Sequence, residues 1–502
     1  MQLARNTRRI AFPAGALLVF GAAAPTAAQT PPAAARHQID TLAIRAHTRF
    51  LADDQLAGRG TGTAGERLAA AYIASQLHRL GLEPLGGDTS FLLPIPLREA
   101  VIDPATRVVL AAERDSTVFR SGIDFVVNTG GRDAFRDFQG RARFLGQPVH
   151  AVNRVPQERD LDGAVAVFMG PLGGFAVDLV PMLTAAGVTG ILLLVPDSAQ
   201  FDLYVRSRGG SRFFVDSPVG DPVWQPALPA IIAGPSLTEA LLAGVRIPED
   251  VTQGDAAPGV DLGRTVRTTI RTDVHTVHAA NVGAVLPGSD PALRDEYVVY
   301  TAHYDHLGVT TPDASGDSIY NGFSDNAAGT AMLLAIAEAL RDDPPQRSVA
   351  FLFFTGEERG LLGSSYMASA PPIPLPRITA LINLDAGAPP APPLNWRIAG
   401  GENSPLGRTA ADVAVRYGWE AVLGAAAPNS DYWPFLQRGV PSIFIIPGPD
   451  WENTSPPERD ALRRRWDRYH QTGDHWHADF PFSGLERYAT FALLVGLAAA
   501  DR

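Results

Sequence analysis

A histidine and an aspartate lie two positions apart at the end of an apolar segment. Residues 297–302 (YVVYTA) are followed by His303, and Asp305 comes two positions later. Such a run is typical of a buried parallel strand, and open α/β sheets place their ligands at the carboxyl ends of these strands. A metal-bound imidazole is often oriented by a carboxylate, so this pair could belong to a metal site. A strand-end histidine that is hydrogen-bonded to its neighbour is the alternative.

Further carboxylates and another histidine follow predicted strands and loops later in the chain. They are Asp325, Glu357, Glu358, Asp385 and His470. The strand ends among them would share one edge of the sheet. Carboxylate oxygens and imidazole nitrogens suit two zinc-type ions, which can activate one water and polarise a carbonyl.

The neighbouring Glu357 and Glu358 could divide two functions in such a site. Adjacent residues at a strand end point in different directions, so one could bind metal while the other takes the proton of the activated water. A solvated turn is the ordinary alternative for such a doublet. Its position after the apolar segment 351–354 favours a buried site.

The amino-acid composition excludes several kinds of site chemistry and of binding partner. The chain has 502 residues, enough for two domains, and a formal net charge of -11. It contains no cysteine, which excludes thiolate ligands, and no lysine, which excludes Schiff-base chemistry. Acidic and basic residues are interspersed without a basic stripe, so no nucleic-acid partner is expected.

The N-terminus has the features of an export signal. Arginines within residues 5–9 precede the apolar segment 10–24, and Ala28 ends a small-residue cleavage site. We therefore predict a signal peptide over residues 1–28 and a periplasmic or secreted protein. The apolar segment is short for a transmembrane helix, so no stable membrane insertion is expected; an uncleaved anchor is the alternative.

A glycine-rich loop near the N-terminus contains a formal GxGxxG pattern from Gly60 to Gly65. No strand precedes it, which disfavours nucleotide binding. Thr63 and Glu66 form a capping box, so the pattern predicts a loop that leads into a helix.

The sequence changes in texture between about residues 106 and 261. Short apolar runs alternate with Gly, Pro and Asp turns, and no cluster of histidines and carboxylates occurs there. We predict an inserted, β-rich, non-catalytic domain over 106–261. Residues 29–105 and 262–502 would form one α/β domain, with a mixed, mostly parallel sheet flanked by helices.

In their order and spacing, the motifs resemble the co-catalytic zinc metallopeptidases, a family that includes bacterial leucyl aminopeptidases and glutamate carboxypeptidase. The resemblance covers about residues 51–82 and 282 to the C-terminus. The matching motifs are His303-Tyr-Asp305-His-Leu-Gly308, Asn321-Gly322 with Asp325-Asn326-Ala-Ala-Gly329, Thr355-Gly-Glu-Glu-Arg-Gly360, Asn383-Leu-Asp385, Ser430-Asp431 and Tyr469-His470. The resemblance implies the zinc exopeptidase fold and two Zn²⁺ ions per chain.

The resemblance also implies the metal ligands. Asp325 would bridge both ions, with His303 and Asp385 completing one site and Glu358 and His470 the other. The last ligand is the least secure, because two more histidines lie nearby, at positions 475 and 477.

Catalytic roles follow from the same resemblance. Glu357 would be the general base and then the general acid for the leaving amine. Asp305 would orient His303, and Tyr469 would lie near the oxyanion. His306 is expected to be a structural or pocket histidine. The segment of the insert from about 160 to 232 resembles a protease-associated domain, which shapes substrate access or contacts.

The function that this resemblance favours is an exported aminopeptidase that releases N-terminal residues from peptide substrates. A carboxypeptidase or dipeptidase of the same family and a single-zinc, glutaminyl cyclase-like acyltransferase are the alternatives. A carboxypeptidase would need a basic residue for the terminal carboxylate, for which Arg359, Arg397 and Arg438 are candidates. A catalytically inactive binding protein is disfavoured, because every expected ligand position is filled. The sequence leaves the oligomeric state open.

Overall fold

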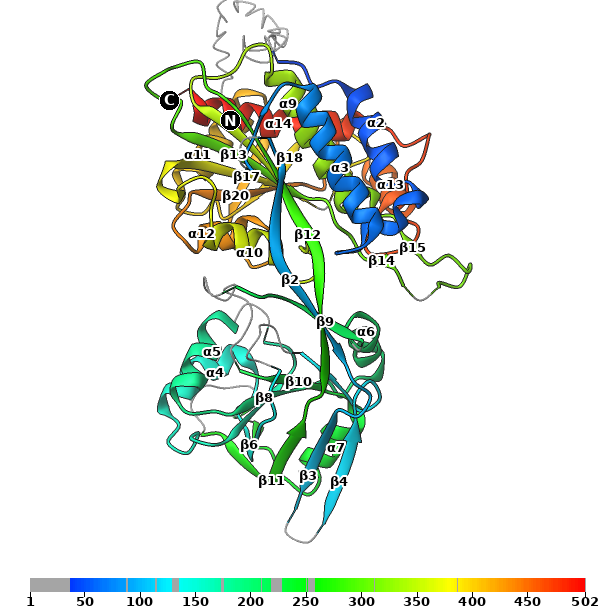
Figure 1. Cartoon of the computed structure of the whole chain (residues 1–502), viewed down its shortest axis with the longest axis vertical. Helices are drawn as coiled ribbons and strands as arrows, with labels where there is room; N and C mark the ends of the chain where they lie inside the picture. The colour runs from blue at the N-terminus through cyan, green and yellow to red at the C-terminus, as the bar shows by residue number, and fades with distance from the viewer. Residues whose placement is uncertain are drawn as a thin grey trace, which may run out of the picture.

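Figure 1 shows the computed structural model of the chain, in which two lobes are joined by a long β-ribbon. The structure describes residues 37–501 except 87–88, 113–114, 129–134, 173–175, 209, 218–227, 250, 252–257, 311 and 386. The predicted signal peptide over residues 1–28 lies outside the described residues.

The first lobe contains a ten-stranded sheet in the order β19-β18-β20-β17-β13-β16-β12-β2-β9, with β1 paired to β12. The four central strands, from β20 to β16, run parallel, and the strands on either side of them are antiparallel to them. The strand bounds are β1 (Glu83–Pro84), β2 (Leu92–Ile102), β9 (Ser211–Val215), β12 (Thr272–Leu286), β13 (Tyr297–His303), β16 (Ser348–Phe354), β17 (Ile378–Leu384), β18 (Asn395–Ala399), β19 (Glu420–Gly424) and β20 (Ser442–Pro447).

Helices cover both faces of this sheet, which confirms the expected mixed α/β architecture. Side chains alternate along each strand, so Tyr300 and Ala302 of β13 pack with the helices α2, α3, α9, α11 and α14, while Val299 packs with α10 and α12. The helix bounds are α2 (Thr41–Leu51), α3 (Ala64–Arg79), α9 (Ala328–Leu340), α10 (Leu362–Ser369), α11 (Pro405–Arg416), α12 (Tyr432–Leu436), α13 (Pro456–Trp466) and α14 (Ser483–Ala500). Within the described part of the chain, no helix has the length and apolarity needed to cross a membrane.

Shorter elements complete this lobe around the carboxyl edge of the sheet. A two-stranded sheet pairs β14 with β15. The bounds are η1 (Asp54–Arg59), β14 (Gly308–Val309), β15 (Ile319–Tyr320), η5 (Phe323–Ala327) and η6 (Leu375–Arg377).

The second lobe is built on an eight-stranded sheet in the order β4-β3-β11-β6-β7-β8-β10-β5. Its strands β6, β7, β8 and β10 run parallel and alternate with helices, so the centre of the insert is α/β. The bounds are β3 (Arg107–Ala111), β4 (Ser116–Arg120), β5 (Phe125–Val127), β6 (Gln139–Phe144), α4 (Pro148–Arg154), η3 (Val155–Gln157), β7 (Val165–Met169), α5 (Ala176–Ala185), β8 (Gly190–Leu194), α6 (Ser198–Arg208), β10 (Ala230–Ala233), α7 (Pro235–Leu242) and β11 (Val260–Thr269).

The predicted end of the insert at residue 261 is wrong, because β11 continues to Thr269 within the second sheet. The pairing of β11 with β6 shifts register between Asp261 and Thr265, and Gly263 between them has a φ of +62°. A bulge of this kind bends a strand and places glycine inside it. In the sequence, the segment around Gly263 has the pattern of a turn, although it lies within the strand β11.

One strand of the predicted insert belongs to the first sheet. β9 pairs antiparallel with β2 from Leu97↔Val215 to Val101↔Ser211. β2 itself pairs with β12 over eleven residues, and Figure 1 shows these two strands running from the upper lobe into the lower one. The range 106–261 is therefore not a separate structural unit throughout.

Close packing of α14 against β13 gives a test of the first lobe. A Cβ atom added at Gly496 would lie 1.8 Å from the hydroxyl oxygen of Tyr300, which is fully buried. We expect Gly496→Ala to lower the free energy of unfolding by about 1–3 kcal/mol through overpacking. Adding Tyr300→Phe removes the clashing oxygen and should recover part of this loss. Denaturant titration would measure both, and equal stability of Gly496→Ala and the unmodified chain would contradict the packing.

Candidate metal centre

The central parallel strands bring the predicted residues to one edge of the first sheet. His303 is the last residue of β13 and pairs in register with Phe354, the last residue of β16. Glu357 and Glu358 follow β16, and Asp385 directly follows β17. These side chains therefore start from adjacent strand ends.

Two groups of side chains among the described residues could hold a metal ion. The first group is His306, Asp325, Glu358 and His470, and the second is His303, Glu357 and Asp385. Within each group, the candidate ligand atoms all lie within 4.8 Å of one another.

Asp325 belongs to the first group and also faces His303 of the second group. Its Oδ1 is 3.1 Å from Nε2 of His303, and its Oδ2 is 3.0 Å from Nε2 of His470. The next residue, Asn326, follows a cis peptide bond and donates from Nδ2 to the carbonyl oxygen of Leu384 at 3.0 Å. The two oxygens of Asp325 therefore face different groups, as a bridging ligand requires.

Asp305 connects three segments beneath the cluster. Its carboxylate accepts hydrogen bonds from the Thr61 hydroxyl at 2.8 Å and from the backbone N–H of Glu357 at 3.1 Å. The ring nitrogen Nδ1 of His303 lies 3.1 Å from the backbone carbonyl oxygen of Asp305 but 3.7 Å from its carboxylate. Asp305 thus orients His303 through its backbone, while its carboxylate fixes the Glu357 loop.

A chain of buried hydrogen bonds orients Asp385. The Thr301 hydroxyl donates to Oδ1 of Asn383 at 2.7 Å, and Nδ2 of Asn383 donates to the Ser430 hydroxyl oxygen at 2.7 Å. The Ser430 hydroxyl in turn donates to Oδ2 of Asp385. The other oxygen, Oδ1, lies 2.9 Å from Nε2 of His303. One oxygen of Asp385 is therefore held in place while the other faces the cluster.

Asp431 is the least satisfied acid of this region. It is fully buried, and neither of its carboxylate oxygens has a hydrogen-bond partner among the described residues. The hydroxyl of Ser364 lies beside it but donates to the carbonyl oxygen of Leu361. Burial raises the pKa of Asp431, His303 lowers it and the carboxylate of Asp385 raises it again, to about 7 overall.

The structure places His470, rather than the two histidines after it, in the cluster. Nε2 of His470 lies 3.0 Å from Asp325 and 3.3 Å from Glu358. Burial lowers the pKa of His470, but hydrogen bonds to these two carboxylates raise it to about 10 overall. The rings of His475 and His477 instead lie against each other, 4.3 Å apart.

Tyr469 lies flat against the ring of His470, with 3.9 Å between the ring centroids. Its side chain is half exposed. Partial burial and the carboxylates of Asp325 and Glu358 raise its pKa above the ordinary value, so the hydroxyl stays protonated and can donate a hydrogen bond. Its predicted role near an oxyanion remains a prediction.

His306, which the sequence predicts to be a structural or pocket histidine, lies in the first group. Its Nδ1 is 2.7 Å from Glu358 and 3.8 Å from Asp325, and its buried Nε2 has no partner among the described residues. Gly322, with a φ of +58°, makes room for the ring, since an added Cβ would lie 2.5 Å from it. The spacing His303-x-x-His306 at a strand end is the sequence signal that could have indicated this.

Asp474 is a contributor that the sequence did not indicate. Its carboxylate accepts hydrogen bonds from the backbone N–H of Ser324 at 3.0 Å and from the Ser324 hydroxyl at 2.9 Å. Its backbone carbonyl accepts one from the N–H of Phe323 at 2.9 Å. Asp474 thereby joins the loop that carries Asp325 to the loop that carries His470.

Arg59 is a buried cation beneath the cluster, and sequence reasoning also missed it. Its side chain is 1% exposed and donates hydrogen bonds to the backbone carbonyls of Leu51, Tyr304, Asn321 and Gly322 at 2.5–3.0 Å. Burial lowers the pKa of Arg59, and Asp305 and Asp325 partly offset this effect; the overall value is about 10, so the guanidinium stays charged near neutral pH. It fixes the segments just after His303 and just before Asp325.

The donor set fits divalent cations. Nε2 of His303 and Nε2 of His470 each face two carboxylate oxygens, although one imidazole nitrogen can offer only one proton or one lone pair. The carboxylates outnumber the one buried guanidinium next to them. Imidazole and carboxylate ligands, without thiolate, suit Zn²⁺.

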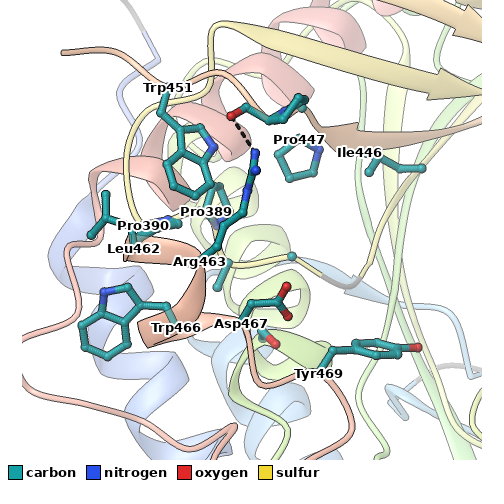
Figure 2. Close-up of a pocket in the computed structure, with 15 residues that line it drawn as sticks. Pro389, Pro390, Ile446, Pro447, Trp451, Leu462, Arg463, Trp466, Asp467 and Tyr469 are labelled. Atoms are coloured by element: carbon teal, nitrogen blue, oxygen red, sulfur yellow. Dashed lines mark hydrogen bonds between the residues drawn. The ribbon is translucent and has the colours of Figure 1, made fainter. Parts of the chain in front are cut away.

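An apolar pocket of about 570 Å³ opens beside the cluster (Figure 2). Three of its lining residues, Ser324, Gly387 and Tyr469, lie within two positions of a candidate metal ligand in the chain. Proline and tryptophan side chains form much of the remaining wall, namely Pro389, Pro390, Pro447, Pro449, Trp451 and Trp466.

Arg463 closes part of this pocket rather than offering a free charge. Its guanidinium carbon lies 5.3 Å from the centre of the Trp451 ring. The side chain also donates to the carbonyl oxygen of Pro449 at 2.9 Å, the hydrogen bond drawn as a dashed line in Figure 2. The wall is therefore mostly apolar, and the exposed carboxylate of Asp467 is its acidic member (Figure 2).

The helix-covered sheet, with imidazole and carboxylate donors gathered at its carboxyl edge, has the donor arrangement of a zinc site. Residues 281–493 match the model of Peptidase family M28, a family of co-catalytic zinc metallopeptidases.

Two curated relatives and one solved structure are similar to the chain. Aminopeptidase YwaD of Bacillus subtilis (strain 168) is 28% identical over 192 residues, which cover 36% of this chain and 40% of that protein. A probable zinc metalloprotease of Pyrenophora tritici-repentis (strain Pt-1C-BFP) is 28% identical over 214 residues, covering 36% and 48%. The chain thus spans less than half the length of these relatives.

The solved structure is that of an aminopeptidase from Aneurinibacillus sp. strain AM-1. It is 18% identical and covers 92% of this chain and 95% of its own, with a TM-score of 0.56. At this identity, the likeness shows a shared fold.

Replacing His306 tests whether it binds metal. We expect His306→Ala to weaken zinc binding by about ten-fold or more, because it removes a donor from the group around Glu358 or frees that carboxylate. Competition with a chelating dye would measure the affinity. His475→Ala is the matched control and should bind zinc as the unmodified chain does; the same affinity for both variants would exclude His306 from the site.

Replacing Arg59 tests the buried cation. Lysine keeps the charge but has fewer donors, so Arg59→Lys should leave backbone carbonyls unsatisfied and lower the free energy of unfolding by about 2 kcal/mol. Because the ligand loops lose their anchor, zinc affinity should fall about 10- to 100-fold. Arg79→Lys, at an exposed position, is the control. Lost stability with unaltered zinc affinity would contradict the positioning role.

Proposed function

We propose that this chain is an exported di-zinc aminopeptidase, which hydrolyses the first peptide bond of peptides with a free N-terminus. Export is inferred from the predicted signal peptide over residues 1–28. The aminopeptidase activity is consistent with the names of similar proteins, among them aminopeptidase YwaD and leucine aminopeptidase 2 of Trichophyton equinum.

The position of Asp325 carries the proposal of two zinc ions. Its two oxygens face His303 on one side and His470 on the other, at 3.1 Å and 3.0 Å. A carboxylate shared in this way serves two ions better than one. Two Zn²⁺ ions bound there would polarise the scissile carbonyl and lower the pKa of a water molecule.

Glu357 has the properties of the group that moves the proton. Burial raises the pKa of its carboxyl group well above the ordinary value; His303 lowers it, and Asp385 and Glu358 raise it again. A raised pKa gives the carboxylate the affinity to take a proton from water and to return it to the leaving amine. The hydrogen bond from its backbone N–H to Asp305 keeps the loop in place during both transfers.

The apolar pocket beside the cluster would receive the side chain of the N-terminal residue. Its wall of proline and tryptophan, with Arg463 already paired, suits a large apolar side chain such as leucine or phenylalanine. Tyr469 lies between this pocket and His470, where its hydroxyl could donate to the substrate. The second lobe would act as a protease-associated domain that limits access.

Replacing the proposed base gives the test. Glu357→Gln should keep the zinc content of the unmodified chain and lose about 10²- to 10⁴-fold in kcat, because the amide cannot take the proton. Glu420→Gln, exposed on β19, is the matched control. Turnover of leucine p-nitroanilide and of free and N-acetylated peptides would be measured with and without chelator. Retained activity in Glu357→Gln, or cleavage of N-acetylated peptides only, would overturn the proposal.

A further inference from the structure

Arg359 is a charged residue beside the cluster that the proposed mechanism does not use. It directly follows Glu357 and Glu358 in the chain. Its Nε is buried and has no hydrogen-bond partner, and no ion pair to Arg359 is found among the described residues. By contrast, Arg438 donates to Pro434 and Ser369, and its guanidinium is thus occupied. Arg359 therefore has donors available for a ligand.

A phenyl ring lies against this guanidinium. The guanidinium carbon of Arg359 lies 5.1 Å from the centre of the Phe213 ring. Phe213 belongs to β9 and packs with the cluster around Leu97 and Leu362. A guanidinium lying over a ring keeps its N–H groups free at its edge, where they match the two oxygens of a carboxylate.

The sheet order puts Arg359 and the apolar pocket on different sides of His303. Residues 387–390 and 446–449 of the pocket follow or end β17 and β20, on one side of β13. Arg359 follows β16 and contacts β9, on the other side of β13. A substrate whose N-terminal side chain enters the pocket and whose scissile bond lies over the cluster would extend its leaving part toward Arg359.

We propose that Arg359, held by Phe213, binds a carboxylate on the residue that leaves, and so selects peptides that carry a negative charge directly after the scissile bond. This inference rests on the proposed aminopeptidase function and names its substrate class. The carboxylate has two sources: the C-terminus of a dipeptide or the side chain of an acidic second residue. Both offer two oxygens to the same guanidinium edge.

Paired substrates that differ in one charge test the proposal. Leu-Leu is compared with Leu-Leu-amide for the terminal source, and Leu-Asp-amide with Leu-Asn-amide for the side-chain source. We expect the unmodified chain to have a kcat/KM about ten-fold or more higher for the charged member of at least one pair. The difference should arise from a lower KM rather than from a higher kcat. Arg359→Gln should reduce that ratio to about two-fold or less, and Arg359→Lys should retain part of it because the charge remains.

Two controls separate this inference from the aminopeptidase proposal. Arg377→Gln, at an exposed position before β17, removes a charge from the chain and should leave the ratios unaltered. Binding of Leu-Leu and Leu-Leu-amide to zinc-loaded Glu357→Gln, with and without Arg359→Gln, is measured by calorimetry and needs no turnover. Arg359 would have no role in binding the carboxylate if Arg359→Gln left the kcat/KM ratios, or the difference in affinity between Leu-Leu and Leu-Leu-amide, unaltered. This conclusion would hold even if leucine p-nitroanilide is hydrolysed. If that substrate is not hydrolysed while the binding difference depends on Arg359, the aminopeptidase proposal fails and the carboxylate site stands.

Discussion

The crowding of buried carboxylates at one edge of a sheet is the constraint on which this structure depends. Burial and mutual repulsion both disfavour the ionised form of such groups, so their coexistence requires positive charge within a few ångströms. The guanidinium of Arg59 supplies part of this charge. Bound cations would supply the rest, which makes metal binding a condition of the local structure as well as of the chemistry.

The surrounding structure prevents the donors from moving apart in response to this repulsion. Three parallel strands, β13, β16 and β17, fix where several of these side chains begin. Hydrogen bonds donated by Ser430 and Asn326, and one that Asp474 accepts from Ser324, fix the loops. The charge of Arg59 serves the same end, because its hydrogen bonds go to backbone carbonyls of two ligand loops. These contacts hold the donors in place against their mutual repulsion, so the fold and the bound cations would together maintain the geometry of the site.

The sequence predicted the parts of the site that depend on local pattern. Apolar runs that end in His303 and Asp385 identify strand ends, and strand ends of a parallel sheet meet without further information. Asp474 and Arg59 could not be found in this way, since their partners lie far away in the chain: Asp474 accepts a hydrogen bond from Ser324, and Arg59 donates to the carbonyl of Tyr304, more than 240 positions later. The predicted end of the insert at residue 261 is wrong for a different reason: a bulge around Gly263 gives the strand β11 the sequence pattern of a turn.

The pairing of β9 with β2 means that the inserted lobe is not a detachable module. Excising the insert would remove the edge strand of the catalytic sheet, leave the hydrogen-bonding groups of β2 open to solvent and delete the Phe213 ring beside Arg359. β2 and β12 run from one lobe toward the other as a paired ribbon (Figure 1), and short segments, 103–106 and 270–271, connect this ribbon to β3 and β11 of the second sheet. A displacement of the outer lobe would therefore twist the edge of the first sheet next to the cluster.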